Sequence, residues 1–292
     1  MQHHFIPFDQ LFLPPKQTLV PRPQMIAPVE QLPPDRLIWL DEVPSTHNLL
    51  KTPEYSGLAP YTMIVARRQP AGRGQRGNSW ESEDYKNLTF SMSLNPAWLH
   101  PASQFSISEA VAMAVVALLD EYGIEARVKW PNDIYAGDRK ICGILIDHSL
   151  QGEEITHTVA SAGINVNQLR FISDAPNPVS MLSLMPEGTP EFDLEPMAIR
   201  VQHLIRHLVE MTRSASGRAD LHAAFMRRLY RNDGQPHPYT DNLTGERIDG
   251  IIADVAPTGH LTLMLPATGE RRVYAFKEVS FILPYKASTT EI

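Results

Sequence analysis

A glycine-rich segment at residues 72–80 has the composition of a loop that binds an anion. Its sequence, GRGQRGNSW, contains three glycines that free the backbone to approach a ligand and two arginines that supply positive charge. It lacks the Gly-Lys-Ser/Thr of a P-loop and the helix that follows a dinucleotide-binding fingerprint. The segment favours phosphate or carboxylate binding of another kind, and a surface turn is the alternative.

Three further motifs carry polar side chains at the ends of apolar runs. KWPND at residues 129–133 places Asn132 and Asp133 in a turn behind a proline. KICGILID at residues 140–147 begins with a lysine and has a glycine in its middle, where glycine often marks the close approach of another group. GINVN at residues 163–167 ends a strand with two asparagines. Ordinary turns, a solvated strand end and core packing are the alternatives, and no motif decides the function alone.

The residues around these motifs favour short strands. LIWL at residues 37–40 is predicted to be a buried strand, and Ser45 is the expected N-cap of the helix that follows. The glycine-rich loop joins two more strands. Over residues 126–166, β-favouring runs predict strands separated by turns at residues 131–132, 137–138 and 151–152. Consecutive strands of this kind predict antiparallel pairing.

Three segments have the apolar spacing of helices. The clearest covers residues 106–122, where Ser106 and Glu109 are expected to form a capping box. A second amphipathic helix carries apolar residues on one face at Val201, Leu204, Ile205, Leu208 and Val209. A shorter helix follows at residues 221–229. We expect the last two helices to pack on the sheet.

Four short strands are predicted beyond residue 240, in the segments IDGIIADV, HLTLML, RRVYAF and EVSFIL, with turns at Thr258-Gly259 and Thr268-Gly269. They predict a small separate β-barrel or sandwich. Strands that are segregated from helices predict an α+β main domain with a mixed, mainly antiparallel sheet. The expected domains are an irregular Pro-rich extension at residues 1–34, a main domain at 35–235 and a small β-domain at 236–292.

The composition excludes several classes of protein. Of the 292 residues, 43% are hydrophobic and 20% are charged, which is typical of a soluble globular chain. The net charge of −7 provides no broad basic surface for nucleic acid, and we expect no segment that crosses a membrane. With one cysteine, Cys142, and no signal peptide, we expect a cytoplasmic protein without a disulfide framework or a multi-cysteine zinc site.

In this order, GRGxxGxxW, KWPND, KxxGIL and GINVN resemble the catalytic domain of biotin protein ligases. The resemblance runs from about residue 39 to residue 184, and the terminal strands are similar to the small C-terminal barrel of that family. It implies the fold shared by class II aminoacyl-tRNA synthetases, followed by an SH3-like barrel. The implied reaction converts biotin and ATP to biotinyl-5'-AMP and pyrophosphate. Biotin then passes to a lysine of a carrier protein, and AMP is released.

The resemblance also assigns roles to residues by their place in the motifs. The implied biotin pocket is formed by Ser45, Thr46, Gln69, Gly72, Arg73, Lys140 and Gly143. The implied ATP and adenylate site is formed by Gly74, Gln75, Arg76, Asn78, Trp80, Lys129, Asn132 and Asn165. Arg73, Lys129 and Lys140 are the expected catalytic cations, which offset charge at the attacked phosphorus. Asp133 is expected to orient the acceptor amine and to be a minor ligand of Mg²⁺, which the ATP phosphates would mainly hold.

The implied partner is the biotin carboxyl carrier protein, a subunit of acetyl-CoA carboxylase or of another biotin-dependent carboxylase or decarboxylase. The chain is expected to be a monomer or a weak homodimer. Because residues 1–34 are rich in proline, we expect no helix-turn-helix and no role as a transcriptional repressor. A lipoate or octanoate ligase and a non-enzymatic biotin-binding protein are the alternatives. The glycine-arginine loop together with KWPND favours biotin over lipoate.

Four positions depart from the family pattern. His47 replaces the usual Asn of the first motif, Pro70 precedes the glycine-rich loop, and Gln75 and Asn78 stand where Arg is common. The last two changes remove two charges from the loop that is expected to close over the adenylate. We therefore expect loop closure to rely more on backbone amides and Trp80 than on arginine side chains.

Overall fold

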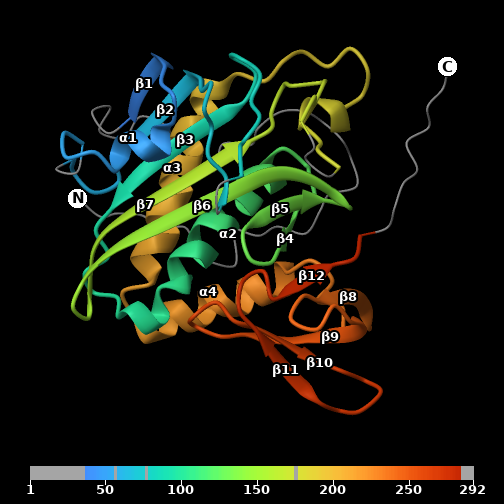
Figure 1. The fold of residues 1–292 in the computed structure, drawn as a ribbon. Helices are drawn as coiled ribbons and strands as arrows, with labels where there is room; N and C mark the ends of the chain where they lie inside the picture. The colour runs from blue at the N-terminus through green and yellow to red at the C-terminus, as the bar shows by residue number, and fades with distance from the viewer. Residues whose placement is uncertain (1–36, 56–57, 76–77, 174–176, 284–292) are drawn as a thin grey trace.

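The computed structural model describes residues 37–55, 58–75, 78–173 and 177–283. The extension predicted at residues 1–34 lies outside this part of the chain. Figure 1 shows a large sheet, helices packed on it, and a smaller sheet formed by the C-terminal strands. The α+β class predicted from the sequence is therefore confirmed.

The larger sheet has seven strands in the order β1-β2-β3-β7-β6-β5-β4. Their bounds are β1 Leu37–Glu42, β2 Met63–Arg68, β3 Leu88–Leu94, β4 Arg127–Lys129, β5 Asp133–Ala136, β6 Arg139–Gln151 and β7 Glu154–Ile164. In this order, every neighbouring pair except β1 and β2 is antiparallel. The antiparallel pairing predicted over residues 126–166 is therefore confirmed. β1 and β2 pair in parallel, since α1 (Thr46–Leu50) and a long loop carry the chain back between them.

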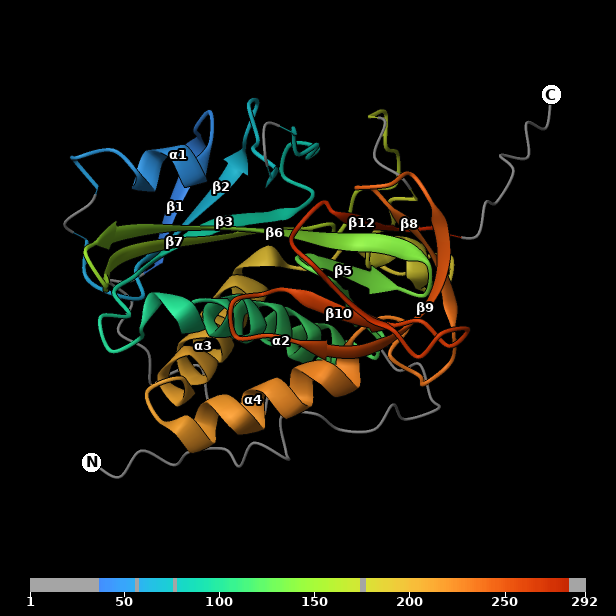
Figure 2. The same ribbon diagram turned by 60° about the horizontal axis from the view of Figure 1, so that its bottom comes forward.

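Three long helices of the described chain cover one face of this sheet, while α1 lies on the other face (Figure 2). They are α2 (Phe105–Glu121), α3 (Leu194–Met211) and α4 (Ala215–Arg228). α2 lies next to the sheet and is buried along most of its length. α3 and α4 pack mainly on α2, and not directly on the sheet as expected from the sequence. The reason is that α2 is apolar on all sides and so presents an apolar surface to both helices.

The capping box predicted for α2 is wrong. The helix begins at Phe105, and its N-cap Gln104 makes no side-chain cap hydrogen bond to any described residue. A 3-10 turn at Pro101–Ser103 leads directly into the helix. Ser106 is buried in the first turn, and His222 of α4 lies 2.7 Å from the Glu109 carboxylate. Glu109 therefore joins two helices and does not cap one.

The stretch Pro101–Glu121 has the length and composition of a membrane span, which was not expected from the sequence. In the fold it is a core helix, since 78% of its most apolar window is buried inside the protein. Two ion pairs with mostly buried side chains fasten its C-terminal end. Glu121 pairs with Arg200 of α3 at 2.6 Å, and Asp120 pairs with Arg228 of α4 at 2.5 Å.

The smaller sheet has antiparallel strands in the order β11-β10-β9-β8-β12. Their bounds are β8 His237–Asp241, β9 Arg247–Val255, β10 Leu261–Met264, β11 Arg271–Tyr274 and β12 Val279–Phe281. Four of them were predicted. β8 was missed because its sequence, HPYTD, is short and contains a proline, which argues against a strand. The buried ring of Tyr239 nevertheless anchors β8 in the core.

The turn at residues 256–260 fastens the smaller sheet to the larger part of the chain. Trp130 donates from Nε1 to the carbonyl oxygen of Gly259 at 2.9 Å. Phe105 donates its backbone N–H to Pro257 at 3.3 Å. Gly259 has a φ of +91°, and a Cβ there would lie 2.8 Å from the Phe105 ring. The predicted turn therefore needs glycine both for its backbone conformation and for this contact.

We expect Gly259→Ala to lower the free energy of unfolding by more than Gly269→Ala does. Both glycines have positive φ and so carry a similar backbone penalty, but a Cβ at Gly269 meets no described atom within 4 Å. Overpacking against Phe105 should add about 1 to 3 kcal/mol of destabilisation. Urea titration of both variants measures the difference. Equal destabilisation would show that the contact with Phe105 imposes no constraint.

Candidate functional site

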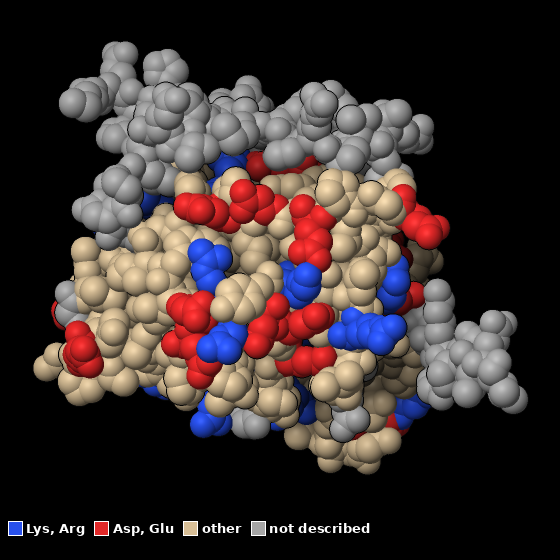
Figure 3. Space-filling view, turned by 90° about the horizontal axis from the view of Figure 1, so that it is seen from above, with Lys and Arg blue, Asp and Glu red and all other residues tan. Residues whose placement is uncertain are grey.

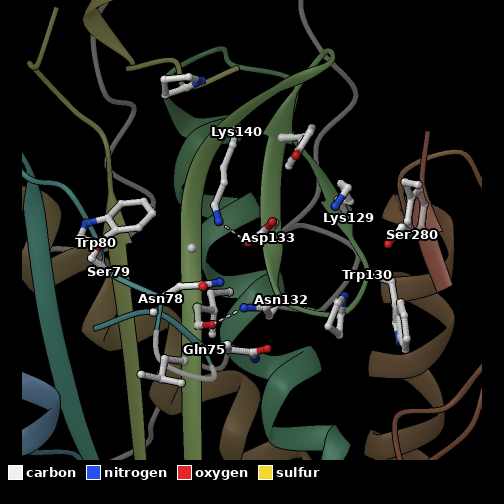
Figure 4. Close-up of a pocket in the computed structure, with 18 of the residues that line it drawn as sticks. Gln75, Asn78, Ser79, Trp80, Lys129, Trp130, Asn132, Asp133, Lys140 and Ser280 are labelled. Carbon is white, nitrogen blue, oxygen red and sulfur yellow. Dashed lines mark hydrogen bonds and ion pairs between the residues drawn. The ribbon is translucent and has the colours of Figure 1, made fainter. Parts of the chain in front are cut away.

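The four sequence motifs meet at a cavity of about 1230 Å³, which we call the large cavity. Its lining comes from the glycine-rich loop, the KWPND turn, β6, the residues after β7, and the C-terminal strands. Figure 4 shows the side chains of this lining. Pockets for small ligands usually occupy about 300 to 1000 Å³, so this cavity has room for a nucleotide.

Charged side chains from three adjacent strands converge in the large cavity. Lys140 Nζ lies 2.6 Å from Asp133 Oδ1, and the two side chains point toward each other in Figure 4. Lys129 is the register partner of Asp133, and its Nζ lies 5.3 Å and 5.1 Å from the ring centroids of Tyr135 and Phe281. Burial lowers the pKa of Lys129, while Asp133 opposes the shift. Two positioned ammonium groups beside one carboxylate suit a polyphosphate ligand.

Two asparagine amides also line the large cavity. Asn132 donates from Nδ2 to the carbonyl oxygen of Ile144 at 2.6 Å, which fixes the KWPND turn against β6. Asn165 donates from Nδ2 to the carbonyl oxygen of Val179 at 3.1 Å. Its Oδ1 is buried and accepts no hydrogen bond from a described residue. Leaving a buried acceptor without a donor is unfavourable, so this oxygen is suited to receive a ligand hydroxyl.

The indole of Trp80 packs against two glycines of the sheet. Gly143 of β6 and Gly163 of β7 are register partners. A Cβ would lie 2.9 Å from the indole at Gly143 and 2.3 Å from it at Gly163. Only glycine at both positions leaves room for the ring. No role was assigned to Gly163 from the sequence, although a glycine inside a strand signals the close approach of another group.

A second cavity, which we call the small cavity, shares Trp80, Gly143 and Leu145 with the large one. Its volume is about 20 Å³, which holds about one water molecule. The lining includes four residues implied for the biotin pocket, namely Ser45, Thr46, Gln69 and Gly143. Ser45 also caps α1 as predicted. The glycine-rich loop or the indole must shift before a larger ligand can enter.

Hydrogen bonds connect the polar residues around the small cavity. Gln69 Oε1 accepts from the backbone N–H and the hydroxyl of Thr46, at 2.9 Å and 3.0 Å. Ser91 contacts the hydroxyls of both Thr46 and Ser161, and Ser161 contacts His47. These two serines were not predicted to belong to the site. They are register partners on β3 and β7, so no local motif places them together.

The described residues on the two sides of the glycine-rich loop, 72–75 and 78–80, lie against each other. Trp80 donates its backbone N–H to the carbonyl oxygen of Gly72 at 3.0 Å, and Gly74 donates to Asn78 at 2.7 Å. A Cβ at Gly72 would lie 2.5 Å from the Trp80 carbonyl oxygen. These contacts hold the backbone of Trp80 against that of Gly72.

Most of the site residues implied by the sequence come together at the two cavities. Those that line the large cavity are Gly74, Gln75, Asn78, Trp80, Lys129, Asn132, Asp133, Lys140, Gly143 and Asn165. Gly72 and Arg73 differ, because neither lines the large or the small cavity of the described chain; Gly72 is buried and the Arg73 side chain is exposed. Arg76 lies outside the described residues.

The smaller sheet contributes part of the large cavity, which was not predicted from the sequence. The contributing side chains include Asn242, Lys277, Ser280 and Phe281. Phe276 packs edge to face on Trp130 of the KWPND motif, with ring centroids 6.2 Å apart. The alternation of residues along these strands shows which side chains are buried, but it does not show which surface they meet.

Comparison with known proteins finds a family profile that matches the part of the chain around this site. The sequence profile of the biotin/lipoate A/B protein ligase family matches residues 39–165, which is less than half of the chain. The bifunctional ligase/repressor BirA of Bacillus subtilis is 32% identical over 133 residues, 45% of this chain and 41% of that protein. The biotin–protein ligase of Homo sapiens is 31% identical over 185 residues, 59% of this chain and 24% of that protein.

The fold also resembles a solved structure. The biotin protein ligase of Aquifex aeolicus in complex with biotin and ATP has a TM-score of 0.69 and 23% identity. The likeness covers 85% of this chain and 99% of that chain. At this identity it shows the fold alone. The matched segments span less than half the length of the bacterial and human relatives.

Proposed function

We propose that this chain is a biotin protein ligase that works in two steps. The observation that carries the proposal is that a small cavity lined by hydroxyls and an amide shares one wall with a large cationic cavity. Lys140 lies beside this wall, with its Nζ 5.6 Å from the centroid of the Trp80 ring. The polar lining of the small cavity suits the ureido edge of biotin once the loop or the indole has shifted, and the large cavity suits ATP.

In the first step, an oxygen of the biotin carboxylate forms a bond to the α-phosphorus of ATP. The bond from that phosphorus to the bridging oxygen breaks, and pyrophosphate leaves with the electron pair. Two anions must approach each other, so cations fixed beforehand lower the barrier. We assign this role to Lys140, beside the shared wall, and to Lys129, held between Tyr135 and Phe281. Arg73 is a third proposed cation.

In the second step, the neutral amine of a carrier lysine attacks the carbonyl carbon of the adenylate. The bond from that carbon to the phosphate oxygen breaks, AMP leaves, and the amine loses one proton to solvent. The mixed anhydride is already activated, so the chain mainly positions the reactants. We assign the orientation of the amine to Asp133, whose carboxylate lines the large cavity.

Magnesium enters this proposal with ATP. The described residues contain no group of three His, Cys, Asp or Glu side chains that could hold a metal ion. Asp133 supplies a hard oxygen donor at the large cavity. This carboxylate fits an ion that the phosphates mainly hold, with few contacts to protein. When bound, the ion neutralises phosphate charge.

We propose a biotin carboxyl carrier protein as the acceptor, and a chain that acts in the cytoplasm as a monomer or weak homodimer. Residues 35–235 and 236–292 are the proposed domains. We propose neither nucleic-acid binding nor repression, because the net charge is −7. Figure 3 shows Asp and Glu side chains interspersed with Lys and Arg on one face.

Incubation with biotin, magnesium ATP and an apo biotin carrier domain, read by avidin blot, tests the proposal. We expect labelling that needs all three components and fails when the acceptor lysine is changed to arginine. Pyrophosphate exchange into ATP that depends on lipoate and not on biotin would make the chain a lipoate ligase. Biotin binding without release of pyrophosphate would make it a binding protein.

A further inference from the structure

The hydrogen bonds around the small cavity form one continuous chain that ends at an ion pair. In order, its members are Gln69, Thr46, Ser91, Ser161 and His47. Beyond them, His47 Nε2 lies 3.0 Å from Asp147 Oδ2, which Lys51 also contacts at 2.5 Å. Each hydroxyl has only one proton to donate, so the two ends of the chain determine the direction of every bond.

The Gln69 end fixes the direction of the hydroxyl protons. The backbone N–H of Thr46 can only donate, so the amide atom 2.9 Å from it is Oε1 and not Nε2. This oxygen only accepts, and the Thr46 hydroxyl therefore donates to it. Ser91 must then donate to Thr46, and Ser161 must donate to Ser91, at 2.8 Å and 2.7 Å. The Ser161 oxygen is left to accept from His47 Nδ1 at 2.8 Å.

The Asp147 end requires a proton on the other ring nitrogen. Partial burial raises the pKa of Asp147, but the hydrogen bonds from Lys51 and His47 lower it by more, so the group is a carboxylate. A carboxylate only accepts, and His47 Nε2 must therefore donate. Both ring nitrogens donate only in the charged imidazolium. Burial lowers the pKa of His47, and Asp147 raises it by less, which favours the neutral ring at neutral pH.

When His47 is neutral, this series of hydrogen bonds has one proton fewer than it has contacts. When Nε2–H donates to Asp147, Nδ1 accepts from Ser161. One contact among Ser161, Ser91 and Thr46 then has no proton between its two oxygens. Two of these oxygens belong to residues that line the small cavity, namely Thr46 and Ser161.

We propose that His47 is a positioning residue whose charge sets the direction of this hydroxyl chain, so that the neutral ring makes the small cavity select a ligand that donates an N–H group. The inference rests on the proposed function, in which the ligand is biotin and its ureido group carries two N–H donors. One of them can donate to the Thr46 or Ser161 oxygen that lacks a donor. When His47 is charged, every hydrogen bond of the series has its proton without the ligand. The preference for a ligand that donates an N–H group is then lost.

Three charged groups of the described chain act on His47. Asp147 of β6 favours the imidazolium, while Lys51, at the end of α1, and Arg73, in the glycine-rich loop, oppose it. Carboxylate, ammonium and guanidinium groups normally keep their charges between about pH 5 and 8, whereas histidine titrates there. A change of ligand affinity in this range therefore reports a histidine, and His47 is the histidine that is hydrogen-bonded to Ser161 at the small cavity.

Calorimetric titration with biotinamide, which has the ureido group and no titrating tail, tests the inference between about pH 8 and 5. We expect Kd to rise about tenfold on acidification, the value of about one hydrogen bond. His47→Asn, which keeps a donor and an acceptor but cannot be charged, should flatten this profile. The matched control is His148→Asn, since His148 is half-buried and is hydrogen-bonded to Thr158, which does not belong to this series of hydrogen bonds. It should keep the wild-type profile.

A wild-type Kd that is independent of pH, or an unchanged slope in His47→Asn, would overturn the inference and leave the proposed function intact. If the protein binds neither biotin nor biotinamide, both the inference and the proposed function are overturned. If His47→Asn does not fold, ¹⁵N NMR of histidine rings in the wild-type chain decides. A neutral ring with its proton on Nε2 at neutral pH supports the inference. A ring that is already charged, or protonated on Nδ1 alone, contradicts it.

Discussion

Replacing Lys140 with methionine should slow biotin-dependent exchange of pyrophosphate into ATP by on the order of 10²-fold to 10³-fold, the usual loss when one group that stabilises developing charge is removed. Methionine keeps most of the side-chain volume and removes the ammonium beside the shared wall. It also leaves Asp133 without its partner at 2.6 Å, so an unpaired carboxylate faces the phosphates. Exchange at saturating biotin and ATP measures the loss, which should appear in kcat because the charge develops in the transition state.

The matched control for this variant is Lys86→Met. Lys86 also pairs with a carboxylate, that of Glu191, but it lines neither cavity in the described chain. Such exposed pairs contribute little, so we expect exchange to stay within about twofold of the wild type. Asp133→Asn in the Lys140→Met background should recover part of the lost rate. Equal losses in Lys86→Met and Lys140→Met would mean that the effect is not specific to the cavity.

Gly163→Ala should speed the loss of biotinyl-5'-AMP from the protein by on the order of 10²-fold, as expected for an ångström-scale displacement at a reacting site. The new Cβ would lie 2.3 Å from the Trp80 indole, so the ring must leave its position on β7. The backbone of Trp80 is hydrogen-bonded to Gly72, so the glycine-rich loop must move together with the indole. Stopped-flow chase of labelled adenylate with unlabelled adenylate measures the rate.

Two further substitutions separate this contact from a general effect on the β6–β7 pair. Gly152 lies in the turn between these strands with φ +62°, and a Cβ there meets no described atom within 4 Å. Asparagine tolerates this backbone conformation, so Gly152→Asn should release adenylate at the wild-type rate. Gly143→Ala, with its closest contact at 2.9 Å, should have a smaller effect in the same direction. An unchanged rate in a folded Gly163→Ala variant would show that the indole is not held by this contact.

The larger sheet and most of the candidate site could be predicted from the sequence because local signals determine them. Alternating β-favouring runs and turn residues specify β4 to β7 whatever lies beside them. The motif residues of the large cavity also lie in short segments, each of which is recognisable by its own sequence. Ser45 is an N-cap for the same reason, since a cap depends only on the next turn of chain.

The features that were missed depend on contacts between segments far apart in sequence. Glu109 has the spacing of a capping box, but its partner is His222 on another helix. Ser91 and Ser161 become neighbours only when β3 and β7 pair, 70 residues apart. The secondary-structure propensity of a residue does not depend on a partner that is distant in sequence. Local patterns therefore predict helices and strands better than the surfaces at which they meet.

The position of Phe281 beside Lys129 has a consequence for the whole chain. A nucleotide bound in the large cavity, as we propose, would contact the smaller sheet as well as the motif residues. Its binding free energy would then be coupled to the docking of that sheet, and each event would favour the other by the same factor. We therefore expect ATP to stabilise the docking of the C-terminal strands more strongly as its concentration rises.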